Sequence, residues 1–335
     1  MRAPLLFLVF ILLLFSACSD LREKKKKADK ASLQELVSSF ESHANALEKE
    51  IDSVATFYDS LIRNKDKILR DLEGYKYKMN GPFSEGLYMK EENYSSIIIL
   101  NSTEDYAKAR QEVKFTNGLD EIFSKIYKRY DIIAQIYSNS ENQVSRVYPF
   151  YDAVGIVDPN INVKDFNFYY KADKENNPSR EYVWIPEPYI DPAGQGWILS
   201  LIKPVYDQDE LFAVLGIDIT VDHLIQRFLE DTNGDYLIVN KKGDIVAGKS
   251  TAIEALSMPP LKNHVYRETI RSDNFRISDF NLFNSKSREV RKMGQAFLLE
   301  SKDQFEFIEE SYLSDAVCRA FKEIEWYAIK INIKS

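Results

Sequence analysis

An acidic residue near the end of a predicted strand is the first candidate for chemistry in this sequence. Residues 211–219 alternate between the two faces of a strand, so Asp218 shares a face with Val214 and Gly216. A lone carboxylate on that face loses its hydration at a considerable cost in free energy unless a cation or hydrogen-bond donors meet it. Because Gly216 leaves room beside it, we expect Asp218 to bind a cationic ligand group in a pocket. The alternative is an acid that caps the helix beginning near Thr220.

Three tyrosines in other segments could form the wall of such a pocket: Tyr169, Tyr170 and Tyr189. The face of an aromatic ring attracts an ammonium group by about 0.5–2 kcal/mol. These rings therefore favour a small cationic or zwitterionic solute as the ligand. Aromatic side chains also fill protein cores, and each of the three tyrosines remains open to that interpretation.

Two further charged residues belong to the candidate site. Asp191 lies in a predicted turn at 190–194, where an aspartate commonly accepts hydrogen bonds from its own backbone. Arg146 stands in a predicted strand at 144–151, and its charge would serve either a ligand anion or a structural ion pair. We include both as candidate ligand contacts, with these structural roles as alternatives.

No catalytic or metal-binding arrangement accompanies these residues in the sequence. The three histidines, His43, His223 and His264, fall on unrelated predicted elements, so they give neither a spaced zinc cluster nor a basis for acid–base catalysis. A net charge of −8, with one dense basic cluster at 24–27, argues against nucleic acid as a partner. We expect a protein that is not an enzyme and holds no metal and no cofactor.

The elements that must position the candidate residues are one long helix and two sheets. Apolar residues recur every three or four positions, and neither Gly nor Pro interrupts residues 21–73, which predicts a long spine helix over 32–75. Short β-branched and aromatic segments follow in 76–224, and the same pattern starts again in 225–335. The predicted fold class is α/β, more narrowly α+β, with a long N-terminal helix followed by two antiparallel-sheet modules.

Within the first module, the spacing of apolar residues predicts helical structure over 107–130. The predicted strands of that module lie at 132–137, 144–151, 184–189, 197–205 and 211–219.

Four short segments of this module match a known pattern in order and spacing: YYKA at 169–172, PYID at 188–191, PVYD at 204–207 and GIDI at 216–219. In these segments the chain resembles the distal module of double Cache sensor domains, which are extracellular. The resemblance extends to the long helix and implies that both sheets are PAS-like. It also implies a membrane-distal ligand-binding module over 76–224 and a membrane-proximal one over 225–335.

The resemblance also implies roles for the candidate residues. Members that bind amino acids hold the ligand carboxylate with an Arg and aromatics of the first segment, and they surround the ammonium group with Tyr and Asp of later strands. Carried over by position, the matching residues here are Tyr169, Tyr170, Tyr189, Asp191 and Asp218. The Arg position is Asn167 in this chain, which lacks the charge and the forked geometry of a guanidinium. We therefore expect a ligand that differs from free amino acids.

The first twenty residues contain an apolar run at 5–15, followed by Ser-Ala and then Cys18. A membrane span needs about 20 apolar residues, so this run is too short. It resembles a bacterial lipoprotein signal, which implies a signal peptide over 1–17, lipidation of Cys18 and a polar spacer over 18–31. The expected location is a membrane anchor on the extracytoplasmic side, either periplasmic or at the cell surface. An uncleaved anchor or an ordinary secretory signal is the alternative.

Together these features predict a sensor lipoprotein. We expect it to bind a small-molecule ligand in the distal module and to signal through a membrane partner protein. The alternative is a scaffold or accessory subunit that uses the same fold as a protein-binding surface.

Overall fold

The computed structural model describes residues 3–85, 93–272 and 274–334, with side chains from residue 21 onward. The chain divides into two compact units. The larger unit is Ser42–Arg227, and the smaller unit combines Met1–Glu41 with Phe228–Ser335. Each unit holds one antiparallel sheet, and the predicted class is confirmed: an α+β fold in which a long N-terminal helix precedes the sheets.

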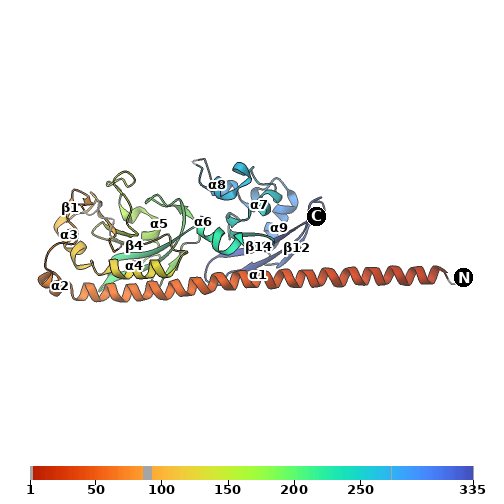
Figure 1. Cartoon of the computed structure of the whole chain (residues 1–335), viewed down its shortest axis with the longest axis horizontal. Coiled ribbons are helices and arrows are strands. Elements are labelled where there is room, and N and C mark those ends of the chain that lie inside the picture. Colours follow the sequence, from red (N-terminus) through yellow and green to blue (C-terminus); the bar gives the residue numbers. More distant parts are fainter. Residues whose placement is uncertain (1–2, 86–92, 273, 335) are drawn as a thin grey trace. The chain divides into compact units, whose positions relative to one another are not determined.

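The N-terminal helix α1 runs from Ala3 to Arg63 and is followed by the short α2, Lys65–Asp71 (Figure 1). The expected spacer at 18–31 is helical in the structure, because neither Gly nor Pro interrupts it. The helix also ends earlier than the expected residue 75. The side chain of Cys18 lies outside the described part of the structure. Its lipidation and the cleavage after residue 17 therefore stay predictions. Within the described part of the chain, no helix combines the length and the apolar character that a membrane span requires.

The strands of the larger unit form one sheet, in which the two longest strands, β8 and β9, are neighbours. Their order is β1-β2-β3-β5-β4-β9-β8-β6, and β7 also pairs with β8. The bounds are β1 Met79–Asn80, β2 Phe83–Ser84, β3 Ser96–Ile99, β4 Gln135–Ser140, β5 Val144–Tyr148, β6 Val183–Trp184, β7 Tyr189–Ile190, β8 Trp197–Asp207 and β9 Glu210–Thr220.

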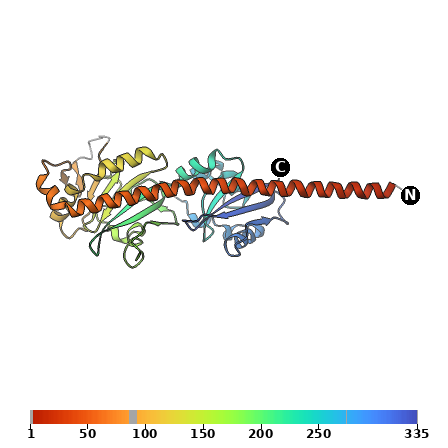
Figure 2. The same ribbon diagram turned by 90° about the horizontal axis from the view of Figure 1, so that it is seen from below.

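Helices cover one face of this sheet. The helical structure expected over 107–130 consists of two helices, α3 Tyr106–Phe115 and α4 Leu119–Arg129, because Thr116 ends the first and Gly118 precedes the second. From residue 42 onward, α1 also packs on the sheet, with Leu47, Ile51 and Tyr58 almost fully buried. Figure 2 shows this part of α1 lying along the strands. The other face carries loops, the 3-10 turn η2 Val163–Asp165 and the short α5 Asn167–Tyr170.

The sheet of the smaller unit has the order β11-β10-β14-β13-β12. A buried polar cluster fixes the register of α1 on it: Lys330 contacts Asp29 at 2.7 Å, and Asn332 Nδ2 donates to Asp29 Oδ2 at 2.8 Å. Phe40 packs nearby against Phe321 and the buried Trp326. The strands are β10 Asp235–Asn240, β11 Ile245–Gly248, β12 Gln304–Glu306, β13 Leu313–Ala320 and β14 Trp326–Ile333.

The remaining described elements connect and cover these strands. The turn into the smaller unit comprises α6 Val221–Leu224 and the π-helical η3 Ile225–Glu230. The units divide after Arg227, close to the expected start of the second module at 225. The other helices of the smaller unit are α7 Ser250–Ala255, η4 Lys262–His264, α8 Tyr266–Ile270, η5 Ile277–Asp279, η6 Leu282–Asn284 and α9 Arg288–Leu298.

Candidate functional site

A cavity of about 50 Å³ lies against the sheet of the larger unit, on the face opposite α3 and α4. One water molecule requires roughly 10–15 Å³ on the same measure, so this space admits a small solute. Much of the wall is apolar and includes Ile98, Leu100, Val147, Val163 and Phe168. The polar side chains that line it are Gln135, Tyr137, Asn139, Ser145, Tyr151, Tyr189, Asp191 and Asp218.

Strand alternation brings these side chains to one face. On β4, Gln135, Tyr137 and Asn139 line the cavity, whereas Ser138 between them contacts Tyr58 of α1 on the other face. The register then joins β4 to β9, because Gln135 stands opposite Asp218. The sheet therefore places an amide and a carboxylate side by side at one end of the cavity.

Asp218 is 1% exposed, and both of its oxygens face side-chain donors. Ser200 Oγ donates to Oδ1 at 2.5 Å, and Gln135 Nε2 donates to Oδ2 at 2.7 Å. Thr220, and not Asp218, caps the following helix, because its Oγ1 accepts a hydrogen bond from the backbone N–H of His223 at 3.0 Å. Asp218 is thus a buried carboxylate at the cavity wall.

Asp191 lies beside Asp218 and also holds its own turn together. Its carboxylate accepts from the backbone N–H groups of Ala193 and Gln195 at 2.9 and 3.1 Å, as the structural alternative expected. Gln135 Nε2 reaches it as well, at 3.2 Å, so one amide group bridges the two carboxylates. Both aspartates line the cavity.

Burial raises the pKa of both carboxyl groups. For Asp218 the loss of hydration is the main cause, and the charge of Asp191 raises its pKa further. For Asp191 burial again dominates, and it is opposed by the donors of its turn and by Gln135. A pair of this kind holds a proton readily when the cavity lacks a cation, and a cation at the same place favours the ionised form.

The predicted tyrosines divide between three environments. Tyr189 lines the cavity, and its hydroxyl is 2.6 Å from Ser200 Oγ. Tyr169 is buried in the apolar core beside the cavity, and its hydroxyl donates to Glu141 Oε2 at 3.2 Å. Tyr170 is 42% exposed. Neither Tyr169 nor Tyr170 is part of the described cavity wall.

Sequence reasoning missed several wall residues, including Gln135, Tyr137 and Phe168. The predicted strand at 132–137 ends before β4 does, which hid the alternation of 135, 137 and 139. Counting that alternation from the hydrophilic Gln135 would have found the first two, because a polar residue at the start of a buried strand needs a partner. Phe168 directly precedes the first matched segment, 169–172, whose tyrosines were the predicted ligand contacts.

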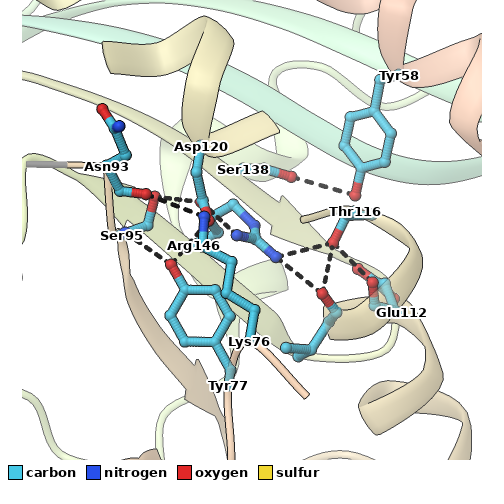
Figure 3. A network of polar contacts seen from close by, with 11 residues as sticks. Tyr58, Lys76, Tyr77, Asn93, Ser95, Glu112, Thr116, Asp120, Ser138 and Arg146 are labelled. Atoms are coloured by element: carbon cyan, nitrogen blue, oxygen red, sulfur yellow. Dashed lines mark hydrogen bonds and ion pairs between the residues drawn. The ribbon is translucent and has the colours of Figure 1, made fainter. Parts of the chain in front are cut away.

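Arg146 belongs to the opposite face of the sheet, which corrects the expectation of a ligand contact. Alternation along β5 points Ser145 and Val147 to the cavity and turns Arg146 toward α3 and α4. There it forms an ion pair with Asp120, and both side chains are buried (Figure 3). The structural alternative weighed for this residue is the one that the geometry supports.

The network around Arg146 and Asp120 is dense. Asp120 also accepts from Lys76 at 2.5 Å, Tyr77 at 2.8 Å and Ser95 at 2.7 Å. Burial acts to raise the pKa of Asp120, but Arg146 and Lys76 hold it below its usual range.

Within the described residues, no group of three or more His, Cys, Asp or Glu side chains is arranged to hold a metal ion.

Solved structures of chemoreceptor sensory domains are similar to this chain. The sensory domain of Campylobacter jejuni chemoreceptor Tlp3 with isoleucine bound aligns with a TM-score of 0.53 and 13% identity, over 94% of this chain and 95% of that chain. The ligand-binding domain of Tlp3 in complex with L-valine aligns with a TM-score of 0.51, 13% identity and the same coverage. These sensory domains are double Cache domains.

The chain has a double Cache fold. No family model matches the sequence, and no curated protein matches it either. The similarity to the solved sensory domains confirms, at the level of the fold, the resemblance of the four segments. In this double Cache fold the larger unit carries the cavity described above, and the segment that contains Asp218 is part of β9.

Gly216 supplies a specific test of the cavity wall. The space expected beside it is filled by the ring of Tyr137, whose Cζ would lie 2.0 Å from an added Cβ. We expect Gly216→Ala to displace this ring and to lower the free energy of unfolding by about 1–3 kcal/mol. Urea unfolding measures the effect, with Gly155→Ala as the control because no atom lies within 4 Å of that added Cβ. Equal stability of the two variants would contradict the packing of Tyr137 on Gly216.

Proposed function

We propose that this chain is an extracytoplasmic, ligand-binding sensor that holds a small cationic or zwitterionic solute in the cavity of its larger unit. The carboxylate of Asp218 is the observation that carries the proposal. It is buried, it borders an open space, and its own donors come from side chains. A desolvated acid in such a place is stabilised by a ligand cation.

The double Cache fold supports the same function. The Tlp3 sensory domain structures, to which this chain is similar, contain isoleucine or L-valine. In the proposed mechanism the ligand joins β9 and β4 to the turn of Asp191 and tightens the larger unit. The chain acts without catalysis, is anchored in a membrane through a lipid on Cys18, and reports occupancy to a membrane partner protein.

A thermal-shift screen of amines and amino acids tests the proposal. We expect a hit to raise the melting temperature of the wild-type protein and to lose its effect in Asp218→Asn. The matched control is Asp209→Asn, which makes the same chemical change in the same unit at a side chain that is 84% exposed. Hits that act equally on all three proteins would place binding outside the cavity.

The alternative of a scaffold or accessory subunit is separated by a second measurement. Detergent-solubilised membranes are passed over the immobilised protein with and without a hit from the screen. A sensor is expected to change its retention of a partner when the ligand is added. A partner that is retained equally in both cases would favour the accessory role.

A further inference from the structure

The cavity is chemically graded along the sheet. Asp218 lies on β9, Gln135 on β4 and Val147 on β5, while Ile98 lies on β3, and these strands neighbour one another in that order. Adjacent strands are about 4.8 Å apart, so roughly 14 Å separates β9 from β3. One end of the cavity is therefore acidic, and the other end is mainly aliphatic, with the neutral Ser145 opposite Ile98.

The acidic end of the cavity is rich in hydrogen-bond acceptors, so it favours a ligand group that donates hydrogen bonds. Gln135 is 3% exposed, and its amide NH2 group donates hydrogen bonds to the carboxylates of Asp191 and Asp218. Its Oε1 is buried without a hydrogen-bond partner. A ligand group that fits here must donate hydrogen bonds to three acceptor groups, and an ammonium group has three N–H bonds to donate.

The same end repels a ligand carboxylate. In an α-amino acid a single carbon atom separates the ammonium nitrogen from the carboxylate, so the two groups enter the acidic end together. Asp191 and Asp218 would then face a like charge in a buried place, where such repulsion is poorly screened. The neutral Asn139 and Ser145, farther along the wall, offer dipoles but no charge to offset it.

We propose that the cavity selects simple amines, with one ammonium group and a short apolar tail, over the α-amino acids that carry the same side chain. This inference rests on the proposed function and narrows its ligand class. The ammonium group binds between Asp218, Asp191 and Gln135. The tail lies toward Ile98 and Leu100.

Isothermal titration of the purified chain with matched pairs tests this selection. Isobutylamine is compared with valine and 2-methylbutylamine with isoleucine, since each amine is the amino acid without its carboxylate. Isobutanol is the uncharged control. We expect each amine to bind at least ten-fold more tightly than its amino acid, and isobutanol to show no binding.

A series of straight-chain amines from propyl to pentyl examines the apolar end. Each added methylene is expected to strengthen binding about four-fold until the cavity is filled. An amino acid that binds as tightly as its amine, or an affinity that ignores tail length, would overturn the selection while leaving a ligand-binding sensor in place. If neither series binds, the selection is likewise overturned, and the proposed function itself fails only if the entire solute screen gives no hit that depends on Asp218.

Discussion

Replacing Arg146 by methionine is expected to lower the free energy of unfolding of the larger unit by about 3–5 kcal/mol. The reason is the charge that remains behind. Asp120 is fully buried, and without the guanidinium the described residues leave it the mostly buried Lys76 and two hydroxyl donors. The two further hydrogen bonds of Arg146, to the carbonyl of Val113 and the hydroxyl of Thr116, are lost as well.

Urea unfolding at neutral pH measures this effect. The matched control is Arg180→Met, which removes a guanidinium that pairs with the exposed Asp209, and we expect a change of about 1 kcal/mol or less. The double variant Arg146→Met with Asp120→Asn should recover part of the loss, because it removes both buried charges together. An Arg146→Met protein as stable as the control variant would show that the ion pair contributes little.

Replacing Asp218 by asparagine is expected to abolish ligand binding and, at the same time, to stabilise the empty protein. Removing one partner of a buried, hydrogen-bonded charge pair costs about 2–5 kcal/mol of binding free energy. In the empty protein, however, the ionised carboxylate lowers the stability of the fold, because burial and the charge of Asp191 disfavour its charged form. Asparagine fills a similar volume without that charge and can still accept a hydrogen bond from Ser200 or Gln135.

The pH dependence of stability distinguishes the two roles. The pKa of Asp218 is raised in the folded protein, so its contribution to stability is complete below the pKa of the unfolded chain and is lost as the pH rises through the folded value. Each pH unit in that window costs about 1.4 kcal/mol for one proton. Glu112, whose pKa burial raises to about 7, adds a slope of the same sign. That slope is common to the wild type and the variant and cancels in the comparison.

The measurement is therefore the free energy of unfolding of the wild type and of Asp218→Asn, compared at several pH values between pH 5 and pH 8. A phosphate buffer is required, since amine buffers are themselves cations that the cavity could bind. We expect the difference in stability to grow in favour of the variant as the pH rises. A difference that is independent of pH would mean that Asp218 is ionised in both states and already has a full counter-charge.

Much of this architecture follows from local sequence patterns. The apolar stripe of α1, the turn residues between strands and the acid near the end of β9 are properties of neighbouring residues, and these patterns predicted a helix followed by two sheets with Asp218 as the leading candidate. Thr220 as the cap of α6 is of the same kind, because a cap depends on residues three positions apart.

The partners of the buried charges were decided only by the tertiary structure. Whether Arg146 meets a ligand or Asp120 depends on which face of β5 meets α4, and a shift of one residue in register exchanges the two faces. Likewise, Gln135 reaches Asp218, which lies 83 residues later in the chain, through the pairing of β4 with β9. The space beside Gly216 belongs to Tyr137 for the same reason. Sequence supplied the acid and its strand, and the long-range register chose its neighbours, because contacts across a sheet depend on how distant strands align.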